Sequence, residues 1–273
     1  APVQDVLALP NGDVWVVMQQ GAMYRWDGQR WLVIDAKAGL PETRVLRLRW
    51  FMEGTAGRLF ATGTGFVAEW DGRRWQRRVL PPALANSDIF DVERIASHGQ
   101  EVLWLATFGQ GLWRCVNTVC LFVPVDGDGP RFNEISTLAV VNETDGSTTL
   151  WAGSYGGGLA SLANGRWTRF HSDNSVLGSN YANQFQVLPG QRGAPQLWAG
   201  LRNGLARWRD GRWEMVKLHG RDSEGRVKAI ARGQDAQGNT QLWLGTDVGA
   251  LRLRLRGSWR TVSRVGQQGN GVW

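Results

Sequence analysis

The sequence predicts an all-β fold in which one four-stranded antiparallel sheet is repeated six times. Three observations support this prediction. A phrase built around a Trp or Phe recurs six times, apolar and polar residues alternate within each copy, and turn residues separate the alternating stretches. The alternation indicates strands with two distinct faces, because successive side chains of a strand point to opposite sides of its sheet.

Each repeat is marked by an aromatic anchor residue. The anchors are Trp15, Phe60, Trp104, Trp151, Trp198 and Trp243, and successive anchors are 45, 44, 47, 47 and 45 residues apart. The repeats have approximate limits 1–42, 43–86, 87–132, 133–179, 180–224 and 225–273. Such repeats are typical of propeller blades, which cannot bury both faces singly. We expect one β-propeller domain over 1–273 with six blades, or part of a seven-bladed ring.

The elements of a blade are expected in a fixed order. A first alternating strand, as in 3–9, 45–50, 135–141 and 227–231, precedes a short turn and the anchor strand. A Gly-containing turn and a third strand follow. Asp-Gly or Asn-Gly then forms a tight hairpin turn at 27–28, 71–72, 164–165 and 210–211, because these residues tolerate positive φ. The fourth strand begins with Trp31, Trp75, Trp167, Trp213 or Trp259.

The hairpin between the third and fourth strands explains several of the 16 Trp residues. Two Trp side chains that stand five residues apart around the turn can face each other across the strands, which stabilises the hairpin. The pairs are Trp26 with Trp31, Trp70 with Trp75, and Trp208 with Trp213.

Cys115 and Cys120 occupy the same hairpin position in the third repeat. Opposed residues bring their Cα atoms to about 4.5–5.5 Å, which a disulfide tolerates. We therefore expect a structural disulfide and an oxidising compartment such as the periplasm. A redox or metal site is the alternative, but no His or further Cys at ligand spacing completes a ligand set.

Charge and composition exclude several classes of function. The net charge of +7 permits an acidic partner, but the basic residues are spread along the chain without a nucleic-acid-binding motif, so we expect no nucleic acid. No apolar stretch reaches the about 18 residues of a membrane-spanning helix. His98, His171 and His219 have neither a metal-ligand spacing nor a nucleophile motif nearby, so we expect no catalytic residue, metal or cofactor.

Three phrases identify a known repeat. LWAGSYGGGL at 150–159, LWAGLRNGL at 197–205 and LWLGTDVG at 242–249 resemble the two-component regulator propeller repeat, with its L-W-x-G-T-x-x-G-L phrase followed by G-x-W. The resemblance covers all six repeats, although Val17, Thr62 and Ala106 replace the first Gly in the first three. It implies a bacterial periplasmic sensor region, joined through a membrane helix to a histidine kinase or diguanylate cyclase output domain.

Candidate ligand-binding residues come from loops that emerge on one face of a propeller, around its axis. Their surroundings repeat while the residues differ, as one asymmetric ligand would require; free drift of exposed loop tips is the alternative. Tyr155 could stack on a sugar ring, and Arg202 could hold a carboxylate or sulfate through two hydrogen bonds. Four residues after the anchors stand Gln19, Thr64, Phe108, Tyr155, Arg202 and Asp247; at the starts of first strands stand Arg44, Asp88, Asn133, Asn180 and Arg226.

The sequence therefore favours a non-catalytic periplasmic sensor that binds a carbohydrate or another small polar ligand. The positive charge favours an acidic oligosaccharide over a neutral one. The expected partners are this ligand and a kinase or cyclase output domain, in the same polypeptide or separate, and a homodimer is compatible with this function. A protein-interaction scaffold is the alternative, and a lyase or hydrolase using His171 or His219 is the second alternative.

Overall fold

The computed structural model describes residues 2–41, 43–53, 56–97, 99–127, 131–189, 194–218, 225–234, 237, 240–247, 249–254 and 259–264. Over these ranges the chain forms twenty-four strands and two short 3-10 helices, Ala36–Ala38 and Pro82–Leu84. No helix there is both long and apolar enough to cross a membrane. The chain divides into two compact units, Ala1–Pro124 with Asn133–Ile135 (unit 1) and Val125–Phe132 with Ser136–Trp273 (unit 2).

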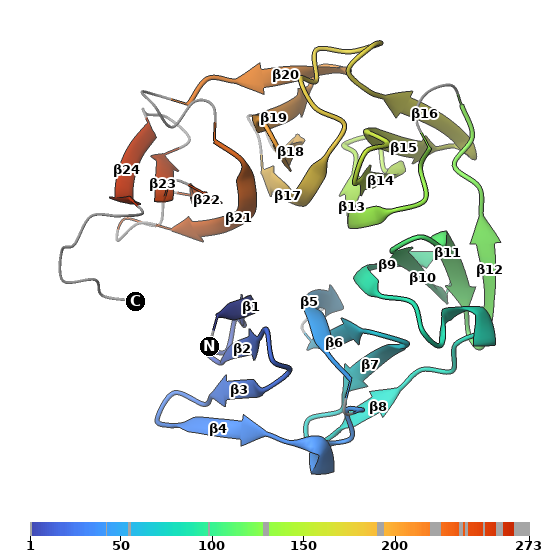
Figure 1. Cartoon of the computed structure of the whole chain (residues 1–273), viewed down its shortest axis with the longest axis vertical. Helices are drawn as coiled ribbons and strands as arrows, with labels where there is room; N and C mark the ends of the chain where they lie inside the picture. Colours follow the sequence, from blue (N-terminus) through green and yellow to red (C-terminus); the bar gives the residue numbers. More distant parts are fainter. Residues whose placement is uncertain are drawn as a thin grey trace. The chain divides into compact units, whose positions relative to one another are not determined.

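Unit 1 contains three antiparallel sheets, each formed by four consecutive strands (Figure 1, blue to green). The first sheet comprises β1 (Val3–Ala8), β2 (Val14–Met18), β3 (Met23–Trp26) and β4 (Trp31–Ile34). The second comprises β5 (Val45–Glu53), β6 (Ala56–Gly63), β7 (Phe66–Trp70) and β8 (Trp75–Arg77). The third comprises β9 (Ile89–Ser97), β10 (Gln100–Thr107), β11 (Gly111–Val116) and β12 (Val119–Val123).

Unit 2 has the same organisation (Figure 1, yellow-green to red). Its first sheet comprises β13 (Ile135–Asn142), β14 (Thr148–Ser154), β15 (Leu159–Ala163) and β16 (Arg166–Phe170). The next comprises β17 (Ala182–Pro189), β18 (Pro195–Leu201), β19 (Gly204–Arg209) and β20 (Arg212–Val216). The last comprises β21 (Val227–Gln234), β22 (Thr240–Thr246), β23 (Gly249–Arg254) and β24 (Trp259–Arg264), and is described only in part.

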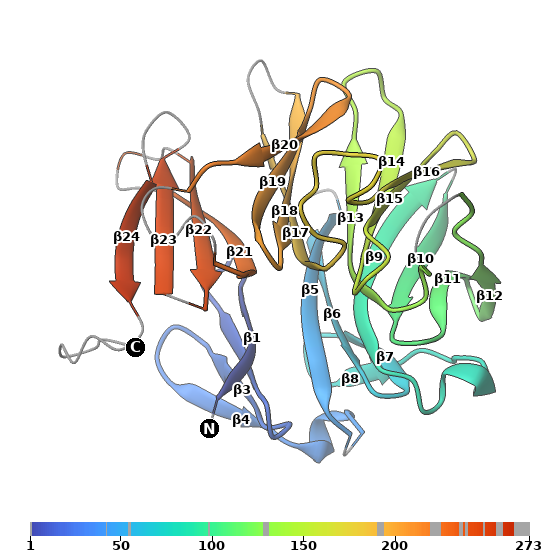
Figure 2. The same ribbon diagram turned by 45° about the horizontal axis from the view of Figure 1, so that its top comes forward.

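These sheets confirm the predicted all-β propeller fold with four-stranded antiparallel blades. The order of strands within every sheet follows the chain, so each sheet is a meander whose strands are joined by short turns. Figure 2 shows the sheets turned from the first view.

The hairpins between third and fourth strands take two forms. Asn164 and Asp210 have φ of 52° and 50°, and the following glycines are also positive, which gives the expected two-residue turns. At Asp27 and Asp71 the loop has four residues and only the glycine has positive φ. There the Asp carboxylate accepts N–H bonds from the second and third residues after it, so its side chain closes the turn.

The paired residues of these hairpins lie directly opposite each other, as predicted. The ring centres are 5.6 Å apart in Trp26 with Trp31, 5.4 Å in Trp70 with Trp75, and 5.5 Å in Trp208 with Trp213. The predicted disulfide between Cys115 and Cys120 is present and joins β11 to β12.

The anchor Trp of one sheet packs against the Trp pair of the next sheet. Trp15 lies 5.2 Å from Trp70 and 5.6 Å from Trp75 in unit 1. Trp151 lies 4.9 Å from Trp208 and 5.2 Å from Trp213 in unit 2. Both anchors are 1% exposed, so the repeated aromatic positions form the cores between neighbouring sheets.

A β-bulge sets how the first strands of neighbouring sheets meet. The extra residue shifts the register of the strand that carries it. Polar side chains near the bulge then point toward the first strand of the adjacent sheet. In unit 2 the Asn183 amide donates to the Val227 carbonyl at 2.8 Å, and the Gln184 side chain accepts from the Ile230 N–H at 3.0 Å. The shifted registers fall at Gln4, Leu46, Phe90, Asn183 and Lys228.

We call such a hydrogen bond, from a side chain of one first strand to the backbone of the next, a clamp. Clamps with other side chains occur at other pairs of sheets. The Asp5 carboxylate accepts from the Leu48 N–H at 2.7 Å, and the Thr137 hydroxyl accepts from the Phe185 N–H at 3.1 Å. These bonds satisfy backbone groups at the seams between sheets, where an unpaired N–H would be costly.

Candidate functional site

The two predicted sets of candidate residues meet through main-chain hydrogen bonds. In five sheets the N–H of the residue four positions after the anchor donates to the carbonyl of the residue directly before the first strand. We call these loops and strand starts the rim, defined by the eleven predicted residues and Tyr181. The bonds are Gln19 to Pro2 (3.0 Å), Thr64 to Arg44 (3.3 Å), Phe108 to Asp88 (3.0 Å), Arg202 to Tyr181 (3.0 Å) and Asp247 to Arg226 (3.3 Å).

The rim residues differ in exposure. Of the eleven predicted residues, five are exposed and six are partly buried, so the predicted set is not uniformly available to a ligand. The exposed residues are Gln19, Arg44, Phe108, Arg202 and Asp247; the partly buried ones are Thr64, Asp88, Asn133, Tyr155, Asn180 and Arg226.

Several rim side chains are engaged in structural contacts. The Thr64 hydroxyl donates to Asp88 at 2.6 Å, and Phe108 packs edge-on against Phe90 at 5.7 Å. The Arg226 guanidinium donates to the Asn183 side chain at 2.7 Å. These contacts order the loops.

Two other rim residues accept hydrogen bonds through their main-chain carbonyls. The Asn133 carbonyl accepts from the Gly111 N–H at 2.9 Å, and the Asn180 carbonyl accepts from the N–H groups of Gly156 and Gly158 at 3.0 and 2.9 Å. Each bond links the loop after one anchor strand to the start of the next sheet.

In unit 2 an exposed tyrosine connects the two residues that the sequence singled out. Tyr155 forms an antiparallel bridge with Tyr181, and the Arg202 guanidinium lies over the Tyr181 ring at 5.1 Å from its centre. Tyr181 is 41% exposed. The described residues provide no carboxylate paired with Arg202, so its donors are available to an anionic group.

In unit 1 a cavity of about 540 Å³ contains Gln19 and Arg44. Gln19 and Arg44 contribute an amide and a guanidinium, and the rest of the wall mixes apolar groups with Gln20, Asp35 and Thr43. The lining is Gln19, Gln20, Gly21, Ala22, Met23, Val33, Ile34, Asp35, Leu40, Pro41, Thr43, Arg44 and Val45. A mostly apolar wall with a few polar groups is typical of a small-molecule site.

Sequence reasoning missed Tyr181 and Asp35. Tyr181 directly follows the predicted Asn180 and was detectable as the one aromatic residue in the stretch 171–183. Asp35 lies after the fourth strand of the first sheet, outside the positions tied to the repeat, so the repeat itself gave no signal for it.

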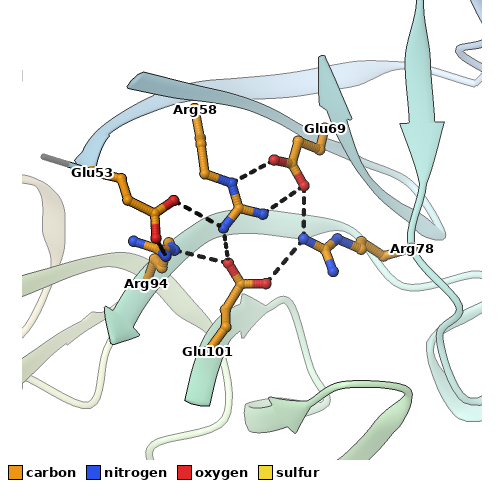
Figure 3. A network of polar contacts seen from close by, with 6 residues as sticks. All are labelled: Glu53, Arg58, Glu69, Arg78, Arg94 and Glu101. Atoms are coloured by element: carbon orange, nitrogen blue, oxygen red, sulfur yellow. Dashed lines mark hydrogen bonds and ion pairs between the residues drawn. The ribbon is translucent and has the colours of Figure 1, made fainter. Parts of the chain in front are cut away.

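The densest cluster of charges lies between the second and third sheets (Figure 3). The Arg58 guanidinium bonds Glu69 on the neighbouring strand at 2.5 Å and also bonds Glu101 on the next sheet. Arg94 donates to Glu101 at 2.8 Å, and Arg78 bonds both carboxylates at 2.7 and 3.0 Å. Three arginines face three carboxylates, so we assign this cluster to sheet association; its members are Glu53, Arg58, Glu69, Arg78, Arg94 and Glu101.

A second group of charges lies on the first strands of unit 1. Asp91 is fully buried and accepts from Arg49 Nε at 2.6 Å, and Arg47 lies 3.6 Å from it. Burial raises the pKa of the neighbouring Glu93 to about 8, and the negative charge of Asp91 acts in the same direction against the attraction of Arg49.

Neither histidine nor any group of potential metal ligands in the described residues adds much to the rim. His171 is 7% exposed, its Nδ1 accepts from the Asp173 N–H at 3.4 Å, and it lies 3.6 Å from the Asp173 carboxylate. These contacts form a local turn. His98 and His219 fall outside the described residues. No cluster of three or more His, Cys, Asp or Glu suited to a metal ion occurs in the part of the chain that the structure covers.

Comparisons with known proteins identify relatives by fold. No protein-family model matches the chain, and no curated protein matches it. The extracellular domain of a hybrid two-component system from B. thetaiotaomicron superposes with a TM-score of 0.66 at 17% identity, covering 92% of this chain and 32% of that one. The chain spans about a third of the length of this domain and of the other extracellular domains from B. thetaiotaomicron that it resembles.

Two enzymes have similar folds. Virginiamycin B lyase from Staphylococcus aureus superposes with a TM-score of 0.63 at 13% identity, covering 95% of this chain and 83% of that one. An ancestral GH74 enzyme gives a TM-score of 0.68 at 13% identity, covering 95% of this chain and 40% of that one. Likeness at these identities shows the shared propeller fold, which hosts both sensors and enzymes.

Proposed function

We propose that this chain is the ligand-binding part of an extracytoplasmic sensor and that its rim binds a carbohydrate or another small polar ligand. The likeness to extracellular domains of two-component systems supports this function, as does the Cys115–Cys120 disulfide, which needs an oxidising compartment. The output would be a kinase or cyclase domain elsewhere in the longer protein or in a partner.

The contact of Arg202 with Tyr181 carries the ligand proposal. The Tyr181 ring attracts the Arg202 guanidinium that lies over it and restricts the movement of this side chain, and the attraction uses none of the N–H groups as hydrogen-bond donors. A carboxylate or sulfate on a sugar could then accept two parallel hydrogen bonds, with the neighbouring Tyr155 contacting the sugar ring. An acidic oligosaccharide therefore fits better than a neutral one.

Signalling follows from differential binding. The ligand would favour one arrangement of this domain relative to its neighbours in the longer protein, because it binds that arrangement more tightly. A ring of six blades is the simplest arrangement of six sheets, and part of a seven-bladed ring remains the alternative.

The test is a titration by calorimetry with oligosaccharides of galacturonic acid and with neutral galactose oligomers of the same length. We expect binding of the acidic series and at least a tenfold loss of affinity in Arg202→Ala. Arg212→Ala removes an exposed arginine of β20, at the opposite end of the strands, and should leave affinity unchanged. Preference for the neutral series, or equal affinity of Arg202→Ala and the unaltered protein, contradicts the proposal.

A protein-interaction scaffold is the second candidate. The outermost strand β12 exposes apolar side chains, with Val119 and Leu121 each 61% exposed and Phe122 55% exposed. Large exposed apolar groups at a sheet edge favour contact with another chain. Because 119–123 contains no charged residue, a second copy could pair with it, and sedimentation of Leu121→Arg against the unaltered protein tests such a dimer.

A further inference from the structure

A second cavity of about 540 Å³ lies in unit 2, away from the rim. It is formed by the turn after β13, the start of β18 and the hairpin between β19 and β20. Figure 2 shows the β13–β14 turn at the upper end of these strands. The lining residues are Glu143, Ala194, Pro195, Gln196, Trp208, Arg209, Asp210 and Gly211.

This cavity and the rim are at opposite ends of the same strands. β18 begins at Pro195, beside the cavity, and ends at Leu201, next to the rim residue Arg202. Seven residues of strand span about 20 Å. A ligand in the cavity is therefore separate from a small ligand at Arg202 and Tyr181.

The Glu143 carboxylate gives the cavity its chemical character. Burial raises the pKa of Glu143, and the nearby negative charge of Asp145 raises it further. No group in the described ranges donates a hydrogen bond to this partly buried carboxylate. A cation bound beside Glu143 would offset both effects on the charged carboxylate, because it supplies an opposite charge and hydrogen-bond donors.

The other charges of the lining compensate each other. Arg209 pairs with Asp210 at 3.1 Å, which leaves Glu143 as the charge that decides the sign of the lining. The whole chain carries +7, so general electrostatic attraction does not draw cations to it. Binding of a cation would depend on the local groups.

Trp208 is the aromatic residue of the lining. Its ring packs against Trp151, Trp213 and Phe170 at 4.9, 5.5 and 5.1 Å between centres. An indole fixed in this way attracts a cation through its electron-rich face and packs against the carbon atoms beside the charge. Carboxylate and indole together suit an ammonium or guanidinium group better than a metal ion.

We propose that this cavity binds an organic cation, whose ammonium or guanidinium group pairs with Glu143 while its carbon skeleton packs against Trp208. The Gln196 amide, also in the lining, offers an additional polar contact. The cation could belong to a free amine or to an amino sugar, because both present the same charged group.

Calorimetric titrations at pH 7 with cadaverine, glucosamine and N-acetylglucosamine test the proposal. We expect cadaverine or glucosamine to bind, and N-acetylglucosamine, which lacks the positive charge, to bind at least tenfold more weakly. Binding of cadaverine only identifies a free amine, and binding of glucosamine only identifies an amino sugar. The proposal is overturned if neither cation binds at a concentration about ten times a Kd of about 1 mM. It is also overturned if the neutral sugar binds as tightly as the cations.

Variants separate this site from the rim. Glu143→Gln keeps the shape of the side chain and should weaken binding of the cation at least tenfold, whereas Asp173→Asn, which alters a carboxylate that is 80% exposed, should not. Arg202→Ala should leave cation binding intact even if it abolishes binding of acidic sugars. Unchanged cation affinity in Glu143→Gln, with the melting temperature retained, would refute the assignment.

Discussion

Arg202 and Tyr181 are joined twice. The Arg202 guanidinium lies 5.1 Å from the centre of the Tyr181 ring, and the Arg202 N–H donates to the Tyr181 carbonyl at 3.0 Å. The backbone bond fixes the two loops relative to each other, and the stacked contact orients the side chain. A guanidinium positioned before a ligand arrives loses less conformational entropy on binding.

The first prediction concerns this stacked contact. Tyr181→Phe keeps the ring beneath Arg202 and should leave affinity for an acidic oligosaccharide within about twofold, whereas Tyr181→Ala should weaken it about tenfold, on the order of 1.4 kcal/mol. Calorimetric titration of both variants provides the measurement. If Tyr181→Phe loses as much affinity as Tyr181→Ala, the hydroxyl rather than the ring matters.

The second prediction concerns the clamp between β13 and β17. Thr137→Val removes the acceptor for the buried Phe185 N–H and should lower the free energy of unfolding by about 1–3 kcal/mol. Urea denaturation measures this loss. Thr168→Val makes the same chemical change at an exposed position of β16 and should have a much smaller effect. Equal losses in both variants would contradict the role of the clamp.

The third prediction concerns the six-residue charge cluster. Glu101→Gln should lower the free energy of unfolding at pH 7 by about 1–2 kcal/mol, because Arg58 and Arg94 lose a charged acceptor in a partly buried setting. Glu214→Gln, which affects more exposed ion pairs with Arg207 and Arg212, should cost less.

The same cluster predicts a pH dependence. Burial raises the pKa of Glu101, but bonds from Arg94 and Arg58 outweigh it, so the folded-state pKa lies below 4.5. The unfolded chain then binds more protons as the pH falls, and stability contributed by Glu101 is lost below about pH 4.5. Urea titrations from pH 7 to pH 3 should show a shallower loss in Glu101→Gln. Parallel curves for the variant and the unaltered protein would be incompatible with this account.

The fourth prediction concerns Glu93, whose contribution to stability changes with pH in the opposite direction to that of Glu101. Burial holds the folded-state pKa of Glu93 at about 8, above the 4.5 of an ordinary glutamic acid. Folding then retains a proton that the unfolded chain releases, so the contribution of Glu93 weakens as the pH rises through that interval. Glu93→Gln should flatten the decline in stability between about pH 4.5 and pH 8, measured by urea denaturation. An unaltered slope would show that Glu93 is ionised in the folded protein.

The fifth prediction concerns the disulfide. The bond closes a short loop between Cys115 and Cys120, so its removal in a Cys115→Ala and Cys120→Ala double variant should cost about 2 kcal/mol. Dithiothreitol should destabilise the unaltered protein by a similar amount and leave the double variant unaffected. Equal stability of the oxidised and reduced protein would show that the bond contributes nothing to folding.

Most of the fold could be predicted because its determinants are local and repeated. The Trp pairs and the Cys pair lie five residues apart around one turn, so their contact follows from hairpin geometry. The clamps could not be predicted, since Thr137 and Phe185 are 48 residues apart and meet only after two sheets pack together. A shift of one residue at the bulge decides which side chain reaches the neighbouring strand.

The candidate site shows the same division. Arg202 and Tyr155 were identified from their positions in the repeat, whereas their link through Tyr181 depends on a bridge between loops of neighbouring sheets. Thr64 and Asp88 were also selected from their positions in the repeat, and the folded structure shows that their side chains bond to each other.

The amino-acid sequence by itself determined the all-β class, the blade unit, the paired hairpin residues and the disulfide, because period-two alternation and turn chemistry act over a few residues. Tertiary structure decided which of the many arginines and carboxylates pair, which rim residues remain exposed, and that Glu143 and Trp208 line one cavity. Those outcomes depend on packing between sheets, where groups far apart in the chain compete for the same partners and lose their water together.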